Sequence, residues 1–469
     1  MTTSSSVAHE LAGAQQALRE FRHQVYDCLD RWPDALFDLV DAQASAVAVD
    51  GLAHLTLAPG ARRGHGSAYR AIADGAIDTG MLRETLAGFR PAEWEPTFAV
   101  DTTLWARPAA QCSPERGLHK YNHAQAQITN GKPITAGWSY SWLVNLSTEP
   151  GSWVAPLDVS RVNTSQTCTE TAIGQILLLL PLLEHPRSQP LPLFVCDAGY
   201  DAVTLGVELA DQPVQTLIRL RNDRVMWTRP QPPTGKRGPG TPRRHGRRFH
   251  FAHPESHTPP DHELALHDPV YGNVHVTAWH QLHPETQTHY RDPDGRPSII
   301  EATILRLTVD KTPRHRQPGP IWLWFNGPAD TFDPDRCWRA YLRRFDVEHF
   351  FRFARQNLGW ATPRLRHPQQ ADRFSQLTAI TATQLRLARP LVADHRLPWQ
   401  KPLTSQQMTP GRVRQGFTHL LATIDTPARW PKPTKPGPGR PKGRTSEPAP
   451  RYEPTRTTKV KIPKELIRP

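Results

Sequence analysis

Cysteine is scarce in this chain. The 469 residues contain five, which are widely separated and form no C-x-x-C pair: Cys28, Cys112, Cys168, Cys196 and Cys337. An odd number of scattered cysteines supports neither a disulfide framework nor a zinc ribbon. We therefore expect a protein of a reducing compartment.

Long apolar runs are also missing. The longest, residues 176–183, contains Pro181 and is far shorter than the roughly 20 residues that span a bilayer. The first residues, Met-Thr-Thr-Ser-Ser-Ser, lack the charged and apolar regions of a signal peptide. These absences predict a soluble, cytoplasmic protein.

Acidic residues are fewer than basic ones, with 44 Asp and Glu against 57 Lys and Arg and a net charge of +13. This excess of positive charge makes a polyanion the expected partner, and nucleic acid is the leading candidate. Proline, at 48 residues, has about twice its ordinary share, which argues against a helical repeat protein or a coiled coil. A wholly disordered chain is excluded because 38% of the residues are apolar.

The first part of the chain, 1–94, has the pattern of a helical domain and is a candidate for DNA binding. Apolar residues recur at spacings of three and four from Leu11 to Val25, and a second helical stretch covers about 68–89. Arg62, Arg63 and Arg70 either contact phosphates or belong to a solvated loop.

Residues 95–224 alternate between predicted strands and helices. Two unbroken apolar runs end in an acid: the segment 98–100 is followed by Asp101, and 191–196 by Asp197. Such runs are typical of strands buried on both faces of a sheet that helices cover, and function in these sheets gathers at strand ends. Further strands are expected over 137–146 and 216–220, with helices over 169–183 and 202–210.

The remaining chain divides into three predicted parts. Residues 225–330 form a β-rich insertion with a basic loop that has no acidic residue, residues 331–427 are helical, and residues 428–469 form a disordered basic tail rich in proline and glycine.

One helix of about 25 residues is expected between Asp333, an N-cap followed by proline, and Gly359, a C-cap. At 100° per residue it places four side chains on one face: Tyr341, Arg344, Glu348 and Arg355. Glu348 in this setting either holds a divalent cation between phosphate-binding arginines or forms a salt-bridged surface with its i,i+4 neighbours.

These residues resemble a known family. Tyr341, Arg344, Glu348 and Arg355 match the Y-R-E-K signature of bacterial DDE-type insertion-sequence transposases, with arginine in place of the final lysine. Asp101 resembles the first catalytic aspartate of those enzymes and Asp197 the second. The order Asp, Asp, β-rich insertion, Glu is also that of the family, and the likeness spans roughly residues 90–400.

The resemblance implies an α/β fold, an RNase H-like mixed sheet flanked by helices. It implies that Asp101, Asp197 and Glu348 bind two Mg²⁺ ions, for which Mn²⁺ can substitute. It also implies that Tyr341, Arg344 and Arg355 contact DNA, that the substrates are transposon terminal inverted repeats and target DNA, and that a homodimer forms the synaptic complex in a bacterial cytoplasm, associated with the nucleoid.

Weaker signals have ordinary interpretations. Asp201 is expected to cap the helix after Asp197, and the pair His119 and His123 lacks a third zinc ligand. Trp279 either stacks on an unpaired base or lies in a core, and the core is the favoured interpretation.

The tail contains the segment 438–444, which resembles an AT-hook. Arg440, Lys442 and Arg444 would enter a narrow minor groove or meet phosphates as part of a nonspecific basic tail. Three functions follow as hypotheses: a DNA transposase, which we favour, a nuclease of the same fold without strand transfer, and a non-catalytic DNA-binding remnant of a mobile element.

Overall fold

The computed structural model describes residues 2–124, 126–129, 131–148, 151–183, 190–231, 243–285, 290–292, 295–312, 318–433, 441–443 and 447–456. The chain forms two compact bodies. The first body comprises Met1–Trp94, Thr102–Glu184 and Asp346–Pro469, and the second body comprises Glu95–Asp101 and His185–Phe345. No helix in the described part of the chain is long and apolar enough to cross a bilayer.

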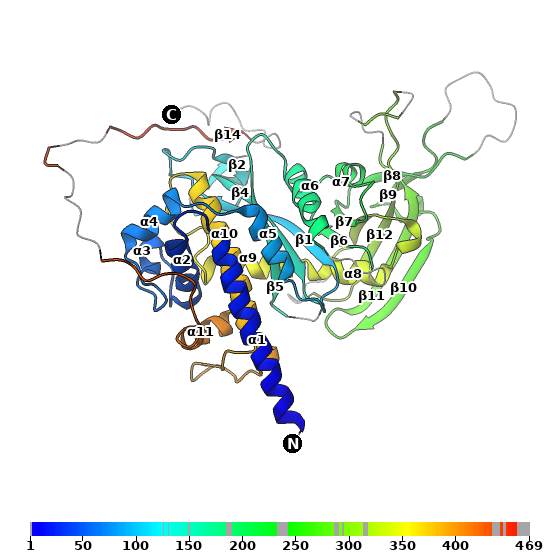
Figure 1. Ribbon diagram of the computed structural model, residues 1–469. Coiled ribbons are helices and arrows are strands. Elements are labelled where there is room, and N and C mark those ends of the chain that lie inside the picture. The colour runs from blue at the N-terminus through cyan, green and yellow to red at the C-terminus, as the bar shows by residue number, and fades with distance from the viewer. Residues whose placement is uncertain are drawn as a thin grey trace. The chain divides into compact units, whose positions relative to one another are not determined.

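Helices open the first body (Figure 1), but the single stretch expected over about 68–89 is two helices separated by residues 75–78. The helices are α1 (Thr2–Asp27), α2 (Pro33–Ser45), α3 (Leu52–Leu55), α4 (His65–Asp74) and α5 (Thr79–Gly88). Leu18, Phe21 and Val25 of α1 are fully buried. Asp78 caps α5 by accepting a hydrogen bond from the Met81 amide at 2.9 Å.

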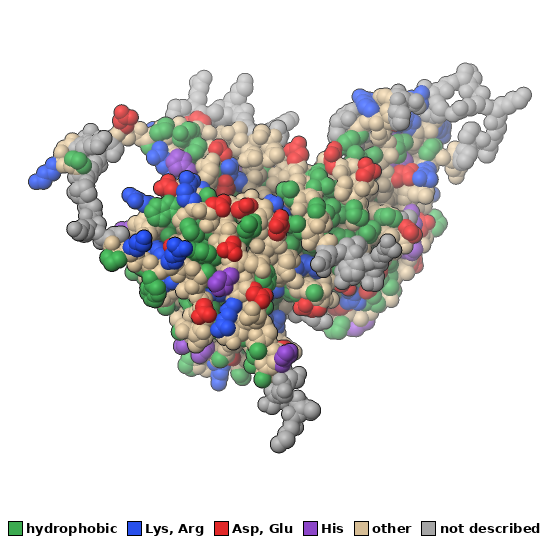
Figure 2. Space-filling model, in the orientation of Figure 1, with side chains coloured by type: hydrophobic (Ala, Val, Ile, Leu, Met, Phe, Trp, Pro, Cys, Tyr) green, Lys and Arg blue, Asp and Glu red, His purple; other side chains and the backbone are tan. Residues whose placement is uncertain are grey.

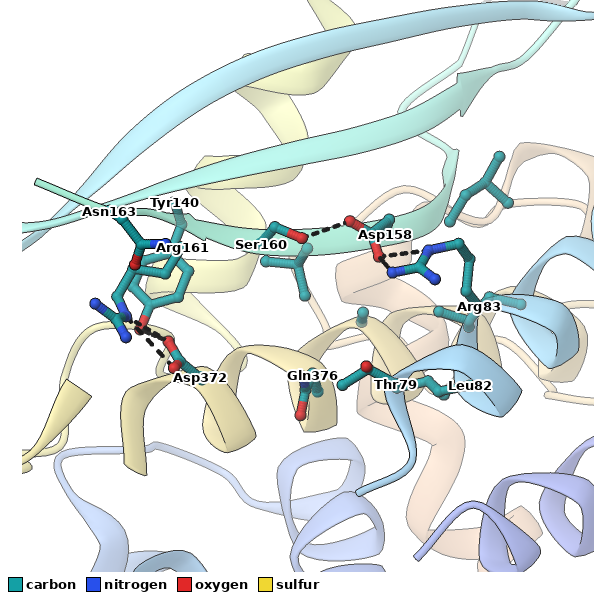
Figure 3. Close-up of a pocket in the computed structure, with 14 residues that line it drawn as sticks. Thr79, Leu82, Arg83, Tyr140, Asp158, Ser160, Arg161, Asn163, Asp372 and Gln376 are labelled. Atoms are coloured by element: carbon teal, nitrogen blue, oxygen red, sulfur yellow. Dashed lines mark hydrogen bonds and ion pairs between the residues drawn. The ribbon is translucent and has the colours of Figure 1, made fainter. Parts of the chain in front are cut away.

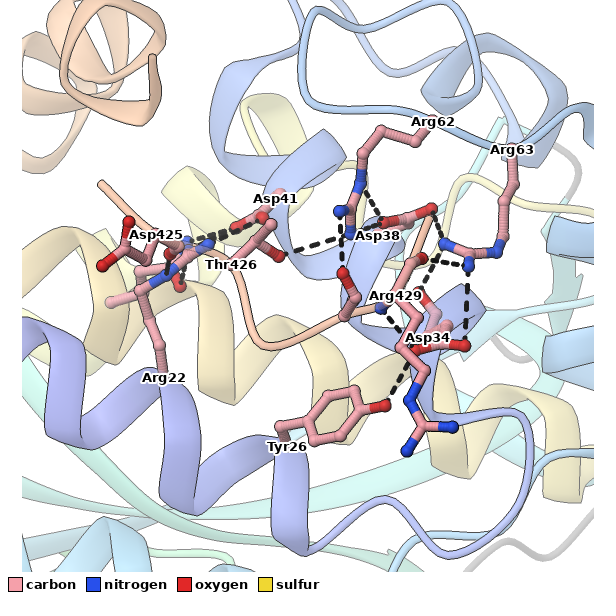
Figure 4. A network of polar contacts seen from close by, with 12 residues as sticks. Arg22, Tyr26, Asp34, Asp38, Asp41, Arg62, Arg63, Asp425, Thr426 and Arg429 are labelled. Carbon is pink, nitrogen blue, oxygen red and sulfur yellow. Dashed lines mark hydrogen bonds and ion pairs between the residues drawn. The ribbon is translucent and has the colours of Figure 1, made fainter. Parts of the chain in front are cut away.

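Arg62 and Arg63 belong to a network of polar contacts with α2 (Figure 4). Arg63 Nη1 donates to Asp38 Oδ2 at 2.6 Å, Arg62 Nε donates to Asp38 Oδ1 at 3.0 Å, and Arg62 Nη1 donates to the Ala428 carbonyl at 2.9 Å. Burial raises the pKa of Asp38, and the two guanidinium groups oppose this shift. The expectation of a solvated loop is therefore wrong for these two arginines, because sequence spacing did not reveal their carboxylate partner; the expectation of phosphate contact stays a prediction.

A second group of helices completes the first body: α9 (Asp346–Gln356), α10 (Pro368–Ala388) and α11 (Pro410–Leu421), with the short 3-10 turn η4 (Ser405–Gln407). α10 packs against α1, α2 and α11 (Figure 1). Its buried polar side chains are paired: the Thr381 hydroxyl donates to Gln43 at 2.9 Å and the Gln384 amide donates to Asp41 at 3.1 Å. These bonds offset the cost of burying the polar groups.

The sheet of the first body is centred on β4 (Lys132–Leu146). This strand neighbours β1 (Thr97–Ala106) and pairs antiparallel with β2 (Gly117–Lys120), β3 (Gln127–Thr129) and β5 (Val154–Val162). α6 (Cys168–Leu179), which starts with a Thr167–Glu170 capping box and continues into η1 (Leu180–Leu182), packs on β4 and β5. The predicted strand over 137–146 is confirmed.

Part of the basic tail belongs to this sheet. β14 (Thr455–Arg456) pairs in parallel with β2, and the buried Arg116 donates from Nη2 to the Tyr452 carbonyl at 2.6 Å. The prediction of disorder for 428–469 is wrong for this segment, because composition does not reveal that a strand edge far away in the sequence accepts its backbone. Lys442 is exposed, whereas Arg440 and Arg444 lie outside the described residues.

The sheet of the second body has the strand order β10-β11-β12-β13-β7-β6-β1. Its strands are β6 (Leu193–Cys196), β7 (Gln215–Leu220), β10 (His262–Asp268), β11 (Gly272–Leu282), β12 (Ala302–Val309) and β13 (Ile321–Asn326). The pairs β1–β6 and β6–β7 are parallel, whereas β13 joins β7 antiparallel. The strands of the predicted β-rich insertion thus extend the same sheet as β6 and β7.

Each face of this sheet has its own core. α8 (Pro334–Arg343) buries Trp338, Tyr341 and Leu342 against one face, in a cluster with Val195 and Leu217. Side chains on the other face alternate with these, and they meet β8 (Val225–Trp227) and β9 (Arg248–His250). The short segments η2 (Pro254–Ser256), η3 (Ala329–Thr331) and α7 (Ala202–Glu208) complete the second body.

Trp279 lies in the aromatic core beside β9. It is 4% exposed, its ring is 5.0 Å from the ring of Phe249, and its Nε1 donates to the Thr258 carbonyl at 2.8 Å. The favoured interpretation as a buried core residue is confirmed. The alternative of stacking on a base is wrong, because neighbouring rings already cover the indole.

The long helix expected between Asp333 and Gly359 is two helices. α8 ends at Arg343, a turn follows at residues 344 and 345, and α9 begins at Asp346. Phe345, which lies in this turn, is 39% exposed. The helical spacing of 100° per residue does not hold across this turn. That spacing therefore does not establish that the four signature residues share one face. Apolar spacing gave no sign of such a short break.

Candidate active site

Two of the three predicted catalytic acids directly follow paired residues of neighbouring strands in the second body. β1 and β6 are parallel with Val100 opposite Cys196, and Asp101 and Asp197 directly follow this pair. Neighbouring strands are about 4.8 Å apart and residues in register point to the same face. The backbone positions of the two acids are therefore adjacent, with Asp101 inside β1 and Asp197 in the turn directly after β6.

The sequence had indicated that Asp101 ends a strand, but in the structure it lies within β1. The strand continues to Ala106. Leu104 and Trp105 are buried and extend the run of apolar contacts beyond the acid. The polar Asp101 had suggested a strand end, but a charged group inside a strand can be neutralised by a partner from another element.

That partner is Arg344, at the C-terminal end of α8. Its Nη1 lies 2.9 Å from Asp101 Oδ2, and the two side chains are 5% and 14% exposed. The guanidinium also lies over the Phe345 ring, 5.0 Å from its centroid. The other end of α8 is capped by Asp333, which accepts a hydrogen bond from the Asp335 amide at 2.9 Å. In this arrangement Arg344 faces an acid inside the fold.

A second arginine belongs to the same line of residues. Ile218 of β7 is opposite Cys196, and Arg219 directly follows it. Asp101, Asp197 and Arg219 thus each directly follow one of three residues that pair across adjacent parallel strands. Sequence analysis missed Arg219. The signal was the one that identified the two acids, a charged residue at the end of an apolar strand.

Tyr341 lies beside this line and is fully buried. Burial raises its pKa, whereas the positive charges of Arg219 and Arg344 act in the opposite direction. The phenol is therefore protonated near neutral pH and can act as a hydrogen-bond donor.

The turn after β6 shapes the position of Asp197. Its Oδ1 accepts a hydrogen bond from the Gly199 amide at 2.7 Å. A Cβ on residue 199 would lie 2.9 Å from that same oxygen, so the absence of a side chain at Gly199 leaves room for the Asp197 carboxylate. Asp201 accepts from the Thr204 amide at 2.9 Å and caps α7, which confirms the capping interpretation.

Glu348 and Arg355 belong to α9 in the first body. Glu348 lies in the first turn and is exposed, while Phe350 is buried with its ring 5.2 Å from that of Trp142. Arg355 donates to Thr103 Oγ1 and to the Leu104 carbonyl, and burial lowers its pKa. Both signature residues are thus placed by the packing of α9 within the first body.

The donor set at the two strands suits magnesium. Mg²⁺ is commonly held by one or two carboxylates together with water and substrate phosphates, and Asp101 and Asp197 provide two such groups. Among the residues that the structure describes, no three His, Cys, Asp or Glu side chains gather as ligands of a metal ion. His119 and His123 are among the described residues, and they do not belong to a group of three such side chains. Burial lowers the pKa of His119 to about 4.

A hollow of about 280 Å³ in the first body contains charged residues whose partners lie within its own wall (Figure 3). Arg83 pairs with Asp158 at 3.0 Å, and Arg161 pairs with Asp372 at 3.0 Å. The Tyr140 hydroxyl donates to Asp372 at 2.8 Å. Because these charges are balanced internally, we assign no ligand to this hollow.

Comparison with known families identifies the chain. The model of a family described as DDE superfamily endonuclease matches residues 24–285, more than half of the chain. The matched region contains Asp101 and Asp197 and ends before Glu348. No curated protein matches the sequence. Enzymes of this superfamily act on DNA and generally use divalent metal ions, and the mixed sheet flanked by helices is consistent with an RNase H-like domain. The chain belongs to the DDE superfamily endonucleases.

Proposed function

We propose that this protein is a DNA transposase that cleaves transposon ends in a metal-dependent reaction and transfers the strand into target DNA. The observation that carries the proposal is that Asp101 and Asp197 directly follow Val100 and Cys196, which pair between the parallel strands β1 and β6. Two carboxylates side by side repel each other unless cations neutralise them, and metal ions with a bound phosphodiester meet that requirement.

Asp101, Asp197 and Glu348 are proposed to hold two Mg²⁺ ions, or Mn²⁺ in their place. When bound, the metal supplies the charge that activates the attacking oxygen and stabilises the leaving oxygen. Asp101 and Asp197 would hold the ions from β1 and from the turn after β6, and Glu348 would supply the third carboxylate from α9. Arg219 adds positive charge near the place where phosphate charge develops.

Arg344 is proposed to neutralise Asp101 until metal and DNA arrive and then to turn to a DNA phosphate. Its fork of donors suits both partners, carboxylate and phosphate. Tyr341 and Arg355 are proposed as further contacts to the transposon end, and this contact requires that the buried Tyr341 become accessible and that Arg355 leave Thr103 when DNA binds. The tail residues Arg440, Lys442 and Arg444 are proposed to enter the minor groove or meet phosphates of flanking DNA.

The wider assembly follows from the same proposal. Synapsis of two transposon ends calls for two protomers, so we propose a homodimer on the terminal inverted repeats and the target DNA. The domain division proposed from the sequence assigns DNA binding to 1–94, the catalytic core and C-terminal helices to 95–224 and 331–427, a β-rich insertion to 225–330 and a basic tail to 428–469. The expected setting is a bacterial cytoplasm.

A nuclease that cuts without joining is the alternative, and the family description as an endonuclease favours it. The discriminating experiment incubates the protein with Mg²⁺, labelled end-bearing duplex and a supercoiled target plasmid. A transposase produces both nicked ends and labelled plasmid. Nicking without labelled plasmid would contradict the strand-transfer proposal, and absence of both would contradict catalysis.

Glu348→Ala tests the cleavage chemistry separately from DNA binding. The Glu348 side chain is exposed, so its loss leaves the packing of α9 intact. We expect this variant to bind the duplex with nearly wild-type affinity and to form neither product. Wild-type cutting by Glu348→Ala would remove Glu348 from the proposed metal site.

A further inference from the structure

Basic side chains alone do not locate a DNA path on this protein. On the face shown in Figure 2, Lys and Arg side chains are interspersed with Asp and Glu. A phosphate site is better sought where arginines lack a carboxylate partner, since an unbalanced cation group favours an anion. The hollow of Figure 3 fails this criterion because its arginines are paired.

Another hollow of the first body meets the criterion. It has a volume of about 480 Å³ and is lined by the turn that follows β1 and by the loop after α9. Arg107 lines it from the turn, and Arg364 and Thr362 line it from the loop. None of the described residues that line it is acidic.

Arg107 is held in place without charge neutralisation. Its Nη2 reaches the Ser113 hydroxyl at 3.5 Å, and its guanidinium lies over the Trp138 ring at 5.8 Å from the centroid. Its Nε is buried and has no hydrogen-bond partner among the described residues. Burial lowers the pKa of Arg107, and the like charges of Arg116 and Arg364 lower it further.

Arg364 and Thr362 complete the donor set. Both are exposed, and within the described part of the chain Arg364 makes no ion pair or side-chain hydrogen bond. Two guanidinium groups and a hydroxyl that face one open hollow form a donor set suited to the oxygens of a phosphate group.

We propose that this hollow binds a backbone phosphate of the DNA substrate through Arg107 and Arg364. The inference rests on the proposed function, because DNA is the source of the phosphate. It adds to that function a DNA contact outside the acidic site, on residues that neither the transposase signature nor the basic tail includes.

The test measures the salt dependence of binding to a labelled duplex by fluorescence anisotropy. Each phosphate contact contributes about 0.9 to the slope of log K against log salt. Arg364→Gln is expected to lower the slope by about that amount and to weaken binding several-fold. Arg366→Gln removes an equal charge two residues away and outside this hollow, so it should keep the wild-type slope.

A second pair of variants changes the hollow without touching an arginine. Ala109 lines the hollow and is exposed. Ala109→Glu places a carboxylate beside the guanidinium groups and should reproduce the loss of slope. Ala109→Gln has the same size without the charge and should bind like wild type.

The outcomes separate the inference from the proposed function. Wild-type slopes in both Arg364→Gln and Ala109→Glu, or an equal loss in Arg366→Gln, would overturn the phosphate site. Stabilisation of the wild type by inorganic phosphate, combined with unchanged DNA binding by Arg364→Gln, would assign the hollow to a small anion and also overturn it. A wild-type protein that binds DNA but never cuts it would contradict the function and not this site.

Discussion

The ion pair between Arg344 and Asp101 gives the sharpest energetic prediction. Arg344→Met keeps most of the packing over Phe345 but removes the charge 2.9 Å from Asp101 Oδ2. Breaking a buried pair costs about 3–5 kcal/mol, and we expect about 3 kcal/mol because Asp101 keeps 14% exposure.

The measurement is a double-mutant cycle on the free energy of unfolding, followed by urea and circular dichroism. Asp101→Asn, Arg344→Met and the double variant isolate the pairwise energy. We expect the double variant to be more stable than the sum of the single changes predicts, by about 2–3 kcal/mol. A coupling energy within about 0.5 kcal/mol of zero would contradict the account of this pair.

Magnesium provides an internal check in the same experiment. A ligand stabilises the folded state by RT ln(1 + [L]/Kd), which is about 1.4 kcal/mol when its concentration is about ten times Kd. Mg²⁺ should stabilise Arg344→Met more than wild type, since Asp101 and Asp197 then lack a neutralising arginine. Equal stabilisation of both proteins by Mg²⁺ would show that the cation does not bind at these carboxylates.

Three further predictions concern separate features. Gly199→Ala should lower the cleavage rate at least about tenfold and change unfolding by less than about 1 kcal/mol, because its Cβ would displace the Asp197 carboxylate; unchanged turnover would contradict the role of this turn. Thr455→Pro removes the amide that donates to the Arg116 carbonyl at 2.7 Å, so limited proteolysis should cut the tail faster than in wild type; an equal rate would contradict tail docking. Burial lowers the pKa of His119 to about 4, below its ordinary 6.5, so folding favours the neutral form. The stability that this gives is present above pH 6.5 and is lost as the pH falls toward 4, by at most about 3 kcal/mol. The melting temperature of His119→Asn should therefore fall less in acid than that of the wild type, and identical pH profiles would contradict this.

Sequence patterns predicted those parts of the fold that local chemistry controls. Unbroken apolar runs identified the strands that contain Phe98 and Val195, and an acid after each run marked Asp101 and Asp197. The cap at Asp201 was recognisable because a short polar side chain before a helix accepts a hydrogen bond from its first turn.

Features that depend on distant partners were not predictable in the same way. The break after α8 leaves apolar spacing almost unchanged, so one helix was expected where there are two. Arg62 and Arg63 carry no sequence sign of their pairing with Asp38. The pairing of β14 with β2 depends on an open strand edge more than 300 residues earlier. Register between β6 and β7, which places Arg219 beside Asp197, likewise emerges only in three dimensions.

The most direct test of the central claim changes the chemical softness of one proposed metal ligand. Asp197→Cys replaces a hard carboxylate, which suits Mg²⁺, with a thiolate, which favours softer metals. The variant should fail to nick end-bearing DNA with Mg²⁺ and recover nicking with Mn²⁺, whereas Asp197→Ala should stay inactive with both. Wild-type nicking by Asp197→Cys in Mg²⁺ would contradict the assignment of Asp197 as a metal ligand.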